Sequence, residues 1–328
     1  AGPAVAAGPA LSGILGPVSP PADTQSAGAV LLVRPATFAS NPETLATNRF
    51  QGALAPGEFV REAVLHEFDQ LAGLLADEVR VHVVHDTPEP PKPDAVFPNN
   101  WFSTHADGTV VLYPMLAPSR RAERRRELVD ALATEGPYRI ARVVDLSHFE
   151  LQGAFLEGTG SLVLDRVAHV AYACRSPRTH AAPLAAFARA MGYEIEAFDA
   201  VDDGGTPIYH TNVVMWIGDG IAAIGAEAIA DREQRRRVLD RLSARHEVVE
   251  LSHAQLAAFA GNALALRGRD GSQLLEMSHR AFHALTDTQR ATIRRHARWL
   301  TAHPVYTIER LGGGSVRCML AEVFLPPA

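Results

Sequence analysis

Short apolar segments alternate with helical segments along almost the whole chain, and this recurrence limits the available folds more than any other feature. The order strand, strand, helix, strand returns about every 60 residues, although the units share no visible sequence identity. One example is a predicted hairpin over 209–224 with Gly218-Asp219-Gly220 at its turn, followed by a predicted helix over 230–243 and a strand over 247–251. The pattern predicts an α/β domain of repeated units.

A doubly wound dinucleotide-binding fold does not fit this pattern. Its glycine-rich loop lies between a strand and a helix. Here the motif Gly158-Thr159-Gly160 is a predicted turn between two strands, over 154–165. We therefore reject a Rossmann-type cofactor site and predict no cofactor.

The first residues show no periodicity. Residues 1–26 are rich in Ala, Gly and Pro and lack the basic start of a secretory signal, so we expect a flexible tail. The length of 328 residues suggests two domains, although one large α/β domain of repeated units is also possible. No apolar run reaches the roughly 18 residues of a membrane span. The net charge of −6 argues against a nucleic-acid surface. We expect no membrane or nucleic-acid partner; the oligomeric state stays open, with a homodimer as one option.

The chain has two cysteines, Cys174 and Cys318, which allow neither a disulfide framework nor a cysteine-based zinc site. This usage is typical of a reducing, cytoplasmic setting, and we interpret Cys174 as a small buried residue. His279 and His283 are four residues apart, but no HExxH motif surrounds them, so no metal site is predicted.

An arginine-rich segment, RRAERRRE, opens a predicted helix over 120–134. Glu123 and Glu127 interrupt its positive charge. We interpret the segment as a solvated helix face instead of a phosphate-binding patch.

Three consecutive glycines, Gly312 to Gly314, lead through Ser315 to Cys318 and a predicted strand over 318–325. Glycine lets the backbone approach a ligand closely. A thiolate nucleophile needs exposure and donors for developing negative charge, which the backbone N–H groups of Gly313, Gly314 and Ser315 could supply. A glycine turn followed by an inert, buried cysteine fits these residues equally, so partners elsewhere must decide.

Two further residues could serve such a nucleophile. A cysteine nucleophile needs a base, and His210 opens the apolar segment HTNVVMWI, where a side chain at a strand end points toward a site. Glu157, in LEGTG, lies between an apolar segment and glycines, where burial is expected to raise its pKa and require partners. Singly, each also fits a structural or solvent-exposed residue.

Together, the strings LEGTG, SPRTH, HTNVV and GGGSVRCM, in this order, resemble the guanidine-modifying (amidinotransferase) superfamily. That group includes arginine deiminase, dimethylarginine dimethylaminohydrolase, amidinotransferases and succinylarginine dihydrolase. The similarity runs from VLLVRP to the C-terminal residues. NPET, FPNNWFS and GGGSVRCM are most similar to the amidinotransferase-like proteins assigned to citrulline utilisation.

The resemblance implies that residues 27–328 form a single pentein catalytic domain: five ββαβ units around a pseudo-five-fold axis, with the active site in the central channel. It implies that Cys318 is the covalent nucleophile, His210 the acid and base, and Glu157 the carboxylate that holds the planar substrate nitrogens. Arg178, in SPRTH, matches the arginine that grips the substrate α-carboxylate, a task suited to a guanidinium fork. The remaining substrate-binding candidates lie in the DAVFPNN loop, namely Asp94, Phe97, Asn99 and Asn100.

The sequence departs from the deiminase pattern at Asn100 and Asn212, where those relatives carry aspartates that grip a cationic guanidinium. Removing one partner of a buried charge pair typically costs about 2–5 kcal/mol. An amide NH2 can instead donate to a ureido oxygen, which an ionised carboxylate cannot do. We therefore expect a cysteine hydrolase that converts citrulline to ornithine, ammonia and carbon dioxide.

Other functions remain as alternatives. The same residues would serve an arginine deiminase, a dimethylarginine-type amidinohydrolase or an amidinotransferase. A non-catalytic pentein that acts as a binding protein is a different class, and the joint presence of the cysteine, histidine, glutamate and arginine argues against it. Nothing in the sequence supports a cysteine peptidase.

Overall fold

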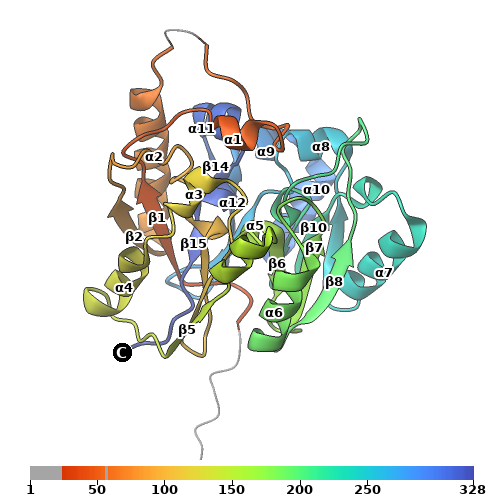
Figure 1. Cartoon of the computed structure of the whole chain (residues 1–328). Helices are drawn as coiled ribbons and strands as arrows, with labels where there is room; N and C mark the ends of the chain where they lie inside the picture. Colours follow the sequence, from red (N-terminus) through yellow and green to blue (C-terminus); the bar gives the residue numbers. More distant parts are fainter. Residues whose placement is uncertain (1–23, 56–57) are drawn as a thin grey trace, which may run out of the picture.

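Five three-stranded sheets form the fold of residues 24–55 and 58–328, the part of the chain that this computed structural model describes (Figure 1). In each sheet the middle strand pairs antiparallel with one neighbour and parallel with the other. The predicted recurrence of an α/β unit is confirmed in this form. The sheets are β3 (Phe102–Thr104), β4 (Thr109–Leu112) and β5 (Arg142–Asp145); β6 (Leu162–Asp165), β7 (Val170–Cys174) and β8 (Glu194–Phe198); β9 (Met215–Gly218), β10 (Ile221–Ile224) and β11 (Glu247–Glu250); β12 (Leu264–Arg267), β13 (Gln273–Ser278) and β14 (Trp299–His303); and β15 (Ala321–Glu322), β1 (Ala29–Arg34) and β2 (Arg80–His85).

A helical crossover joins the two parallel strands of every sheet, because parallel strands cannot be connected by a tight turn. In α2 the residues Val64, Phe68, Leu71 and Leu75 recur at helical spacing and are buried, as the sequence predicts. The apolar core lies between such helices and their sheets. The crossover helices are α2 (Arg61–Glu78), α4 (Arg126–Thr134), α6 (Ala181–Met191), α7 (Arg232–Ser243) and the pair α9 (His279–Ala284) and α10 (Asp287–His296).

The fifth sheet combines segments from opposite ends of the described chain. β15 pairs antiparallel with β1, with Val30 opposite Glu322 and Leu31 opposite Ala321. β2 continues the sheet on the other side of β1 in parallel register. This sheet therefore has the same strand pattern as the other four, although its first strand comes last in the sequence.

Short helical turns precede the first strand of four sheets: η1 (Pro98–Asn100), α5 (Gly158–Ser161), η3 (Thr211–Val213) and α12 (Val316–Met319). α5 contacts both η1 and η3, and α12 contacts η1. Before β12, the turn that follows α8 (His253–Ala257) takes the equivalent place. These turns bring polar residues from distant parts of the chain together. The remaining short helices are α1 (Pro42–Leu45), α3 (Pro118–Arg121), η2 (Ser147–Gln152), η4 (Ala226–Ala228) and α11 (Tyr306–Gly312).

Two predicted strands begin later than predicted, and one predicted turn has a different conformation. Cys318 lies in α12 instead of a strand, and β15 contains only Ala321 and Glu322. The strand predicted over 209–217 begins at Met215, and 158–161 form a helical turn where we predicted a glycine turn. At Gly158, φ is 47°, and an added Cβ would press against the backbone carbonyl oxygens of two residues of η1. The backbone leaves the extended conformation here so that neighbouring turns can meet.

The arginine-rich segment is also different from its prediction. The helix over 120–134 is divided into α3 and α4, and Arg120 and Glu123 are buried together, 2% and 3% exposed. Only later residues of the segment, such as Arg126 and Glu127, lie at the surface. Mutual ion pairing makes the burial of Arg120 and Glu123 compatible with a folded interior.

The folded body begins before residue 27. Gln25 is buried, donates to the carbonyl oxygen of Leu164 at 2.9 Å and accepts from the backbone of Arg166 at 2.8 Å. Ser26 is buried and donates to Asp219 at 3.0 Å. Both residues belong to the body, so the tail boundary at 26 was placed too late. The remaining tail residues, 1–23, lie outside the described residues.

None of the helices in the described ranges is long and apolar enough to cross a bilayer.

Candidate active site

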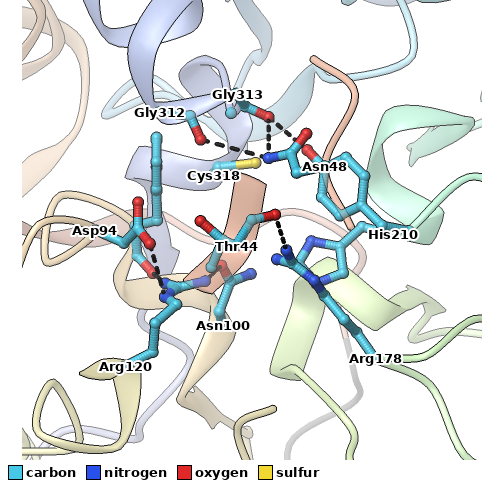
Figure 2. A pocket seen from close by; sticks show the side chains of 13 residues that line it. Thr44, Asn48, Asp94, Asn100, Arg120, Arg178, His210, Gly312, Gly313 and Cys318 are labelled. Carbon is cyan, nitrogen blue, oxygen red and sulfur yellow. Dashed lines mark hydrogen bonds and ion pairs between the residues drawn. The ribbon is translucent and has the colours of Figure 1, made fainter. Parts of the chain in front are cut away.

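A small pocket of about 20 Å³ lies where the short helical turns meet (Figure 2). Eight of its lining residues are candidates from the sequence: Asp94, Phe97, Asn100, Arg178, His210, Gly313, Gly314 and Cys318. The other lining residues are Thr44, Asn48, Arg120, Tyr209 and Gly312. The pocket therefore brings together residues from both halves of the chain, with the sulfur of Cys318 on one wall.

The sulfur of Cys318 is held by two carboxamides. Cys318 is 3% exposed, and its Sγ accepts from Nδ2 of Asn212 at 3.4 Å and from Nδ2 of Asn262 at 3.3 Å. Asn262 also donates to the backbone oxygen of Asn212 at 2.9 Å. Asn212, a predicted substrate-binding residue, thus contacts the sulfur in this structure and does not line the pocket.

The glycine loop presents both acceptors and donors to its surroundings. The N–H of Gly313 donates to the carbonyl oxygen of Glu309 at 3.0 Å, so this amide is already engaged, contrary to its predicted oxyanion role. The carbonyl oxygen of Gly313 accepts from Tyr209 and from Asn48. Within the described chain, the amides of Gly314 and Ser315 have no protein acceptor, so they remain candidates for stabilising an oxyanion.

Glu157 forms a hydrogen bond with His210 and an ion pair with Arg178, two residues that line the pocket. Its Oε2 lies 2.9 Å from Nε2 of His210 and 3.4 Å from Nη1 of Arg178, and its Oε1 accepts from the amide of Leu116 at 3.1 Å. Burial alone would raise the pKa of Glu157, but Arg178, the hydrogen bond from His210 and Arg120 together hold it well below its ordinary value. The expected rise in pKa was therefore wrong, and Glu157 is ionised.

His210 is a neutral base with a defined tautomer. Burial lowers the pKa of His210 to about 4, with Arg178 and Arg120 acting in the same direction and Glu157 opposing them. Because the ionised Glu157 can only accept, Nε2 of His210 carries the proton, and Nδ1 keeps its lone pair. An added Cβ on Gly160 would lie 2.8 Å from Nδ1 of His210 and against Nδ2 of Asn100, so glycine is required for this approach.

Arg120, which we predicted to be solvated, is buried, lines the pocket and contacts Glu123 and Asn100. Its guanidinium donates to Glu123 through Nε at 3.0 Å and Nη2 at 2.9 Å, and through Nη1 to Oδ1 of Asn100 at 2.9 Å. The hydrogen bond from Arg120 sets the orientation of the Asn100 amide, with Oδ1 directed toward the guanidinium. Nδ2 of Asn100 then has no partner among the described residues and is available to an oxygen in the pocket.

Arg178 links the site to the segment that contains α1. It is 2% exposed and donates to the carbonyl oxygen of Thr44 at 3.3 Å (Figure 2). It also donates to Oγ1 of Thr47 at 2.8 Å and pairs with Glu157. Its Nε has no partner in the described chain. The proposed grip on a substrate carboxylate stays a prediction.

Asp94 lines the pocket as a buried carboxylate. It accepts from Nδ2 of Asn41 at 2.7 Å, and its nearest guanidinium atom, Nε of Arg120, is 3.7 Å away. Burial raises the pKa of Asp94, and Arg120 and the bond from Asn41 limit the rise. Asp94 is thus the acidic residue among those that line the pocket, and its distance to Arg120 is longer than the 2.9 Å between Arg120 and Glu123.

Other candidates lie away from the pocket. Asn99 is fully buried, and neither atom of its amide has a partner in the described chain. Ser315 donates through Oγ to Glu309 at 2.6 Å and so stabilises the turn that precedes Cys318. Cys174 is buried, and burial raises the pKa of its thiol to about 12. His279 and His283 lie on α9, and the described residues contain no group of three or more His, Cys, Asp and Glu that could hold a metal.

The sequence analysis missed Thr44, Asn48, Arg120, Tyr209 and Asn262. For Asn262 there was a signal, because an asparagine also precedes the apolar strand at Asn100 and Asn212 in two other units. For Arg120 there was none, because a buried arginine and a solvated one have the same sequence pattern.

The sequence model of the family described as N,N dimethylarginine dimethylhydrolase, eukaryotic, matches residues 34–325. No curated protein matches the chain.

Solved structures give a consistent fold. The chain is similar to ArgZ, an arginine dihydrolase from the ornithine-ammonia cycle in cyanobacteria, with a TM-score of 0.70 and 17% identity over 92% of this chain. It spans 41% of that ArgZ chain but 97% of the N-terminal domain of ArgZ bound to substrate. The chain is also similar to DDAH from Pseudomonas aeruginosa, in a variant with a cysteine replaced by serine that is complexed with citrulline. The TM-score is 0.62 and the identity 13%, over 91% of this chain and 100% of the DDAH chain. At these identities, the likeness shows a shared fold.

Proposed function

The chain belongs to the N,N dimethylarginine dimethylhydrolase family, within the guanidine-modifying enzymes, and on this premise we propose that it hydrolyses the ureido group of citrulline through Cys318. One observation carries the proposal: a cysteine held by amides and a neutral histidine line one pocket, and an ionised glutamate forms a hydrogen bond with that histidine. A cysteine nucleophile with an oriented base is the arrangement that covalent hydrolysis requires.

The reaction proceeds in two halves. Sγ of Cys318 forms a bond to the ureido carbon while the electron pair of the C=O bond moves onto oxygen. When the carbonyl re-forms, the bond to the amino-acid nitrogen breaks, and His210 delivers the former thiol proton to that nitrogen, which releases ornithine. Water, deprotonated by His210, then attacks the carbamoyl thioester. The resulting carbamic acid separates into ammonia and carbon dioxide, so citrulline and one water balance the three products.

The tautomer of His210 supports this role. Glu157 keeps the proton on Nε2, and Nδ1 remains free to accept one from the thiol or from water. The amides of Gly314 and Ser315 are the donors proposed for the developing oxyanion. Structures of the N-terminal domain of ArgZ include one with an asparagine replaced by serine that is covalently bound to a reaction intermediate, which supports covalent chemistry in this fold.

The amide of Asn100 supports a ureido substrate. Because Arg120 occupies its oxygen, Asn100 offers the pocket a donor and no charge. A ureido oxygen accepts such a donor, whereas a guanidinium has only N–H groups to present. An unsatisfied buried donor typically costs about 1–3 kcal/mol, so the favoured ligand carries an acceptor at this point.

A second candidate is hydrolysis of the guanidino group of arginine or a dimethylarginine. Asp94 favours it, because this buried carboxylate lines the pocket, its ion pair with Arg120 is long at 3.7 Å, and it could also hold a guanidinium. ArgZ is described as an arginine dihydrolase, and AgrE, another protein of similar structure (TM-score 0.71, 18% identity), forms a complex with L-arginine as a cysteine-to-alanine variant. The charge on the substrate thus separates the two candidates.

We also propose that residues 24–328 form one catalytic domain whose five sheets close into a pentein ring. Neighbour contacts support closure: β9 lies beside β6 and β12, and β15 lies beside β3. A backbone bridge between Ala27 and Leu266 connects the sheet of β1 to that of β12.

Parallel incubations with citrulline and arginine, assayed for ornithine, citrulline and ammonia, test the function. We expect ornithine and ammonia in equal amounts from citrulline. Citrulline accumulating from arginine would replace the proposal with deimination. The Cys318→Ser variant should keep its circular dichroism spectrum and thermal midpoint but lose turnover with both substrates.

A further inference from the structure

We infer that Asn262 is a thiolate-stabilising residue of the site, holding Sγ of Cys318 in its reactive, charged form. Its Nδ2 lies 3.3 Å from Sγ, and Asn262 is fully buried. It belongs to the turn before β12, in the one unit to which we assigned no functional residue. The inference rests on the proposed nucleophilic role of Cys318.

The orientation of the Asn262 amide is set by a second contact. The same Nδ2 donates to the backbone oxygen of Asn212 at 2.9 Å. A carbonyl oxygen can only accept, so the NH2 group of Asn262, and not its oxygen, must face this position. The second hydrogen of that NH2 group then points to Sγ. The sulfur therefore meets a donor, which stabilises a thiolate and offers nothing to a thiol proton.

Asn212 does not fix its own orientation in this way. Its Nδ2 lies 3.4 Å from Sγ, but its Oδ1 has no partner in the described chain that would prevent the amide from turning. The unpartnered Oδ1 of Asn262 shows no competing acceptor role either. Asn262 is thus the donor that the fold enforces, and Asn212 supplies the backbone oxygen that enforces it.

A neutral substrate makes this donor necessary. A guanidinium bound beside a thiol favours the thiolate by its own charge, whereas a ureido group brings no charge. Among neutral groups, a carboxamide can donate to sulfur without adding a proton that titrates near neutrality. An aspartate at residue 262 would remove the donor and, when ionised, would repel the thiolate.

Several charged or titratable groups surround Cys318. His210, Asp94, Arg120, Arg178 and Tyr209 line the same pocket, and Glu157 lies behind His210. Arg317 is the preceding residue, paired with Glu322, and β13, which packs against α12, contributes Glu276 in its pair with His303. None of these changes in an Asn262 variant, so a difference from wild type reports on the amide.

The test compares the rate of alkylation by iodoacetamide from pH 5 to 10 in wild type, Asn262→Ala, Asn262→Asp and the control Gln70→Glu. Gln70 is exposed on α2, so its variant adds the same type of charge at a distance. We expect the alkylation midpoint of both Asn262 variants to move to higher pH, with labelling at pH 7 slower by about tenfold or more, since a hydrogen bond to a charged group is strong. The control should match wild type.

Thermal midpoints and alkylation of Cys318→Ser, measured alongside, separate the outcomes. A lower thermal midpoint with an unchanged alkylation midpoint would make Asn262 purely structural and overturn the inference. If Cys318 is not labelled even in wild type, Cys318 is not a reactive nucleophile, and this result rejects the proposed function as well as the inference. If Asn262→Ala does not fold, the isosteric Asn262→Asp variant carries the comparison.

Discussion

Nε2 of His210 lies 2.9 Å from Oε2 of Glu157, and this contact decides which nitrogen of the imidazole can act as a base. With Glu157 ionised beside Arg178, the bonded nitrogen must donate, and the lone pair is left on Nδ1. A buried carboxylate thus serves the site by orienting a proton, in addition to any contact with a substrate.

Replacing Glu157 by Gln should remove this control. The amide can donate to or accept from His210, so the tautomer of His210 is no longer fixed. Arg178 also loses its carboxylate partner. We expect kcat to fall by about 100-fold or more, as for loss of general acid–base function. Steady-state kinetics with citrulline measure the effect. Circular dichroism and size exclusion check the fold, and kcat near the wild-type value would contradict the orienting role.

Stability should depend on pH through His210. Its folded-state pKa is about 4, below the unfolded value of 6.5, so between these values the unfolded chain binds more protons. The free energy of unfolding therefore decreases as the pH falls from 6.5 to 4, by up to about 3 kcal/mol from this group. Urea unfolding at pH 7 and pH 4 should show a larger loss for wild type than for His210→Gln. Equal losses would show that His210 titrates normally in the folded protein.

Asn100→Asp should change substrate preference. The substitution replaces a donor with a carboxylate, which suits a guanidinium and repels a ureido oxygen. We expect kcat/KM for citrulline to fall by about tenfold or more, while the ratio of arginine to citrulline turnover rises. The two substrates are compared in one assay for ornithine and ammonia. An unchanged ratio would remove Asn100 from substrate recognition.

Gly160→Ala should reduce activity by steric contact alone. The added methyl would lie 2.8 Å from Nδ1 of His210 and against Nδ2 of Asn100. Overpacking of this kind typically costs about 1–3 kcal/mol and displaces the side chains involved. Gly73→Ala is the matched control, because a Cβ at this exposed position of α2 meets nothing within 4 Å. Kinetics and thermal midpoints should be impaired only in Gly160→Ala.

The units of the fold were predictable from sequence because burial leaves a periodic signal. The apolar stripe of α2 and the hairpin of β9 and β10 follow from patterns that local chemistry enforces. The strand starts near Cys318 and His210 were not predictable, since apolar residues there face the core from helical turns. The periodicity of a short apolar run does not distinguish a helical turn from a strand.

The site was predictable only where a residue type has few other uses. Cys318, His210 and Glu157 were named because each sits beside glycines or at the start of an apolar segment. Arg120 was missed because its burial depends on Glu123 and Asn100, which pack against it only in the folded chain. The bond of Asn262 to Asn212 links two units and has no local signal beyond the repeated asparagine.

The pairing of β15 with β1 has a consequence for biosynthesis. A ribosome exposes β1 early, but its antiparallel partner and the turn with Cys318 are translated almost a full chain length later. Until then, the sheet of β1 lacks an edge strand, and the growing polypeptide contains Cys174 but not Cys318. Cys318 is translated just before the strand that completes this sheet, so a chain truncated before residue 318 lacks both the edge strand and this cysteine.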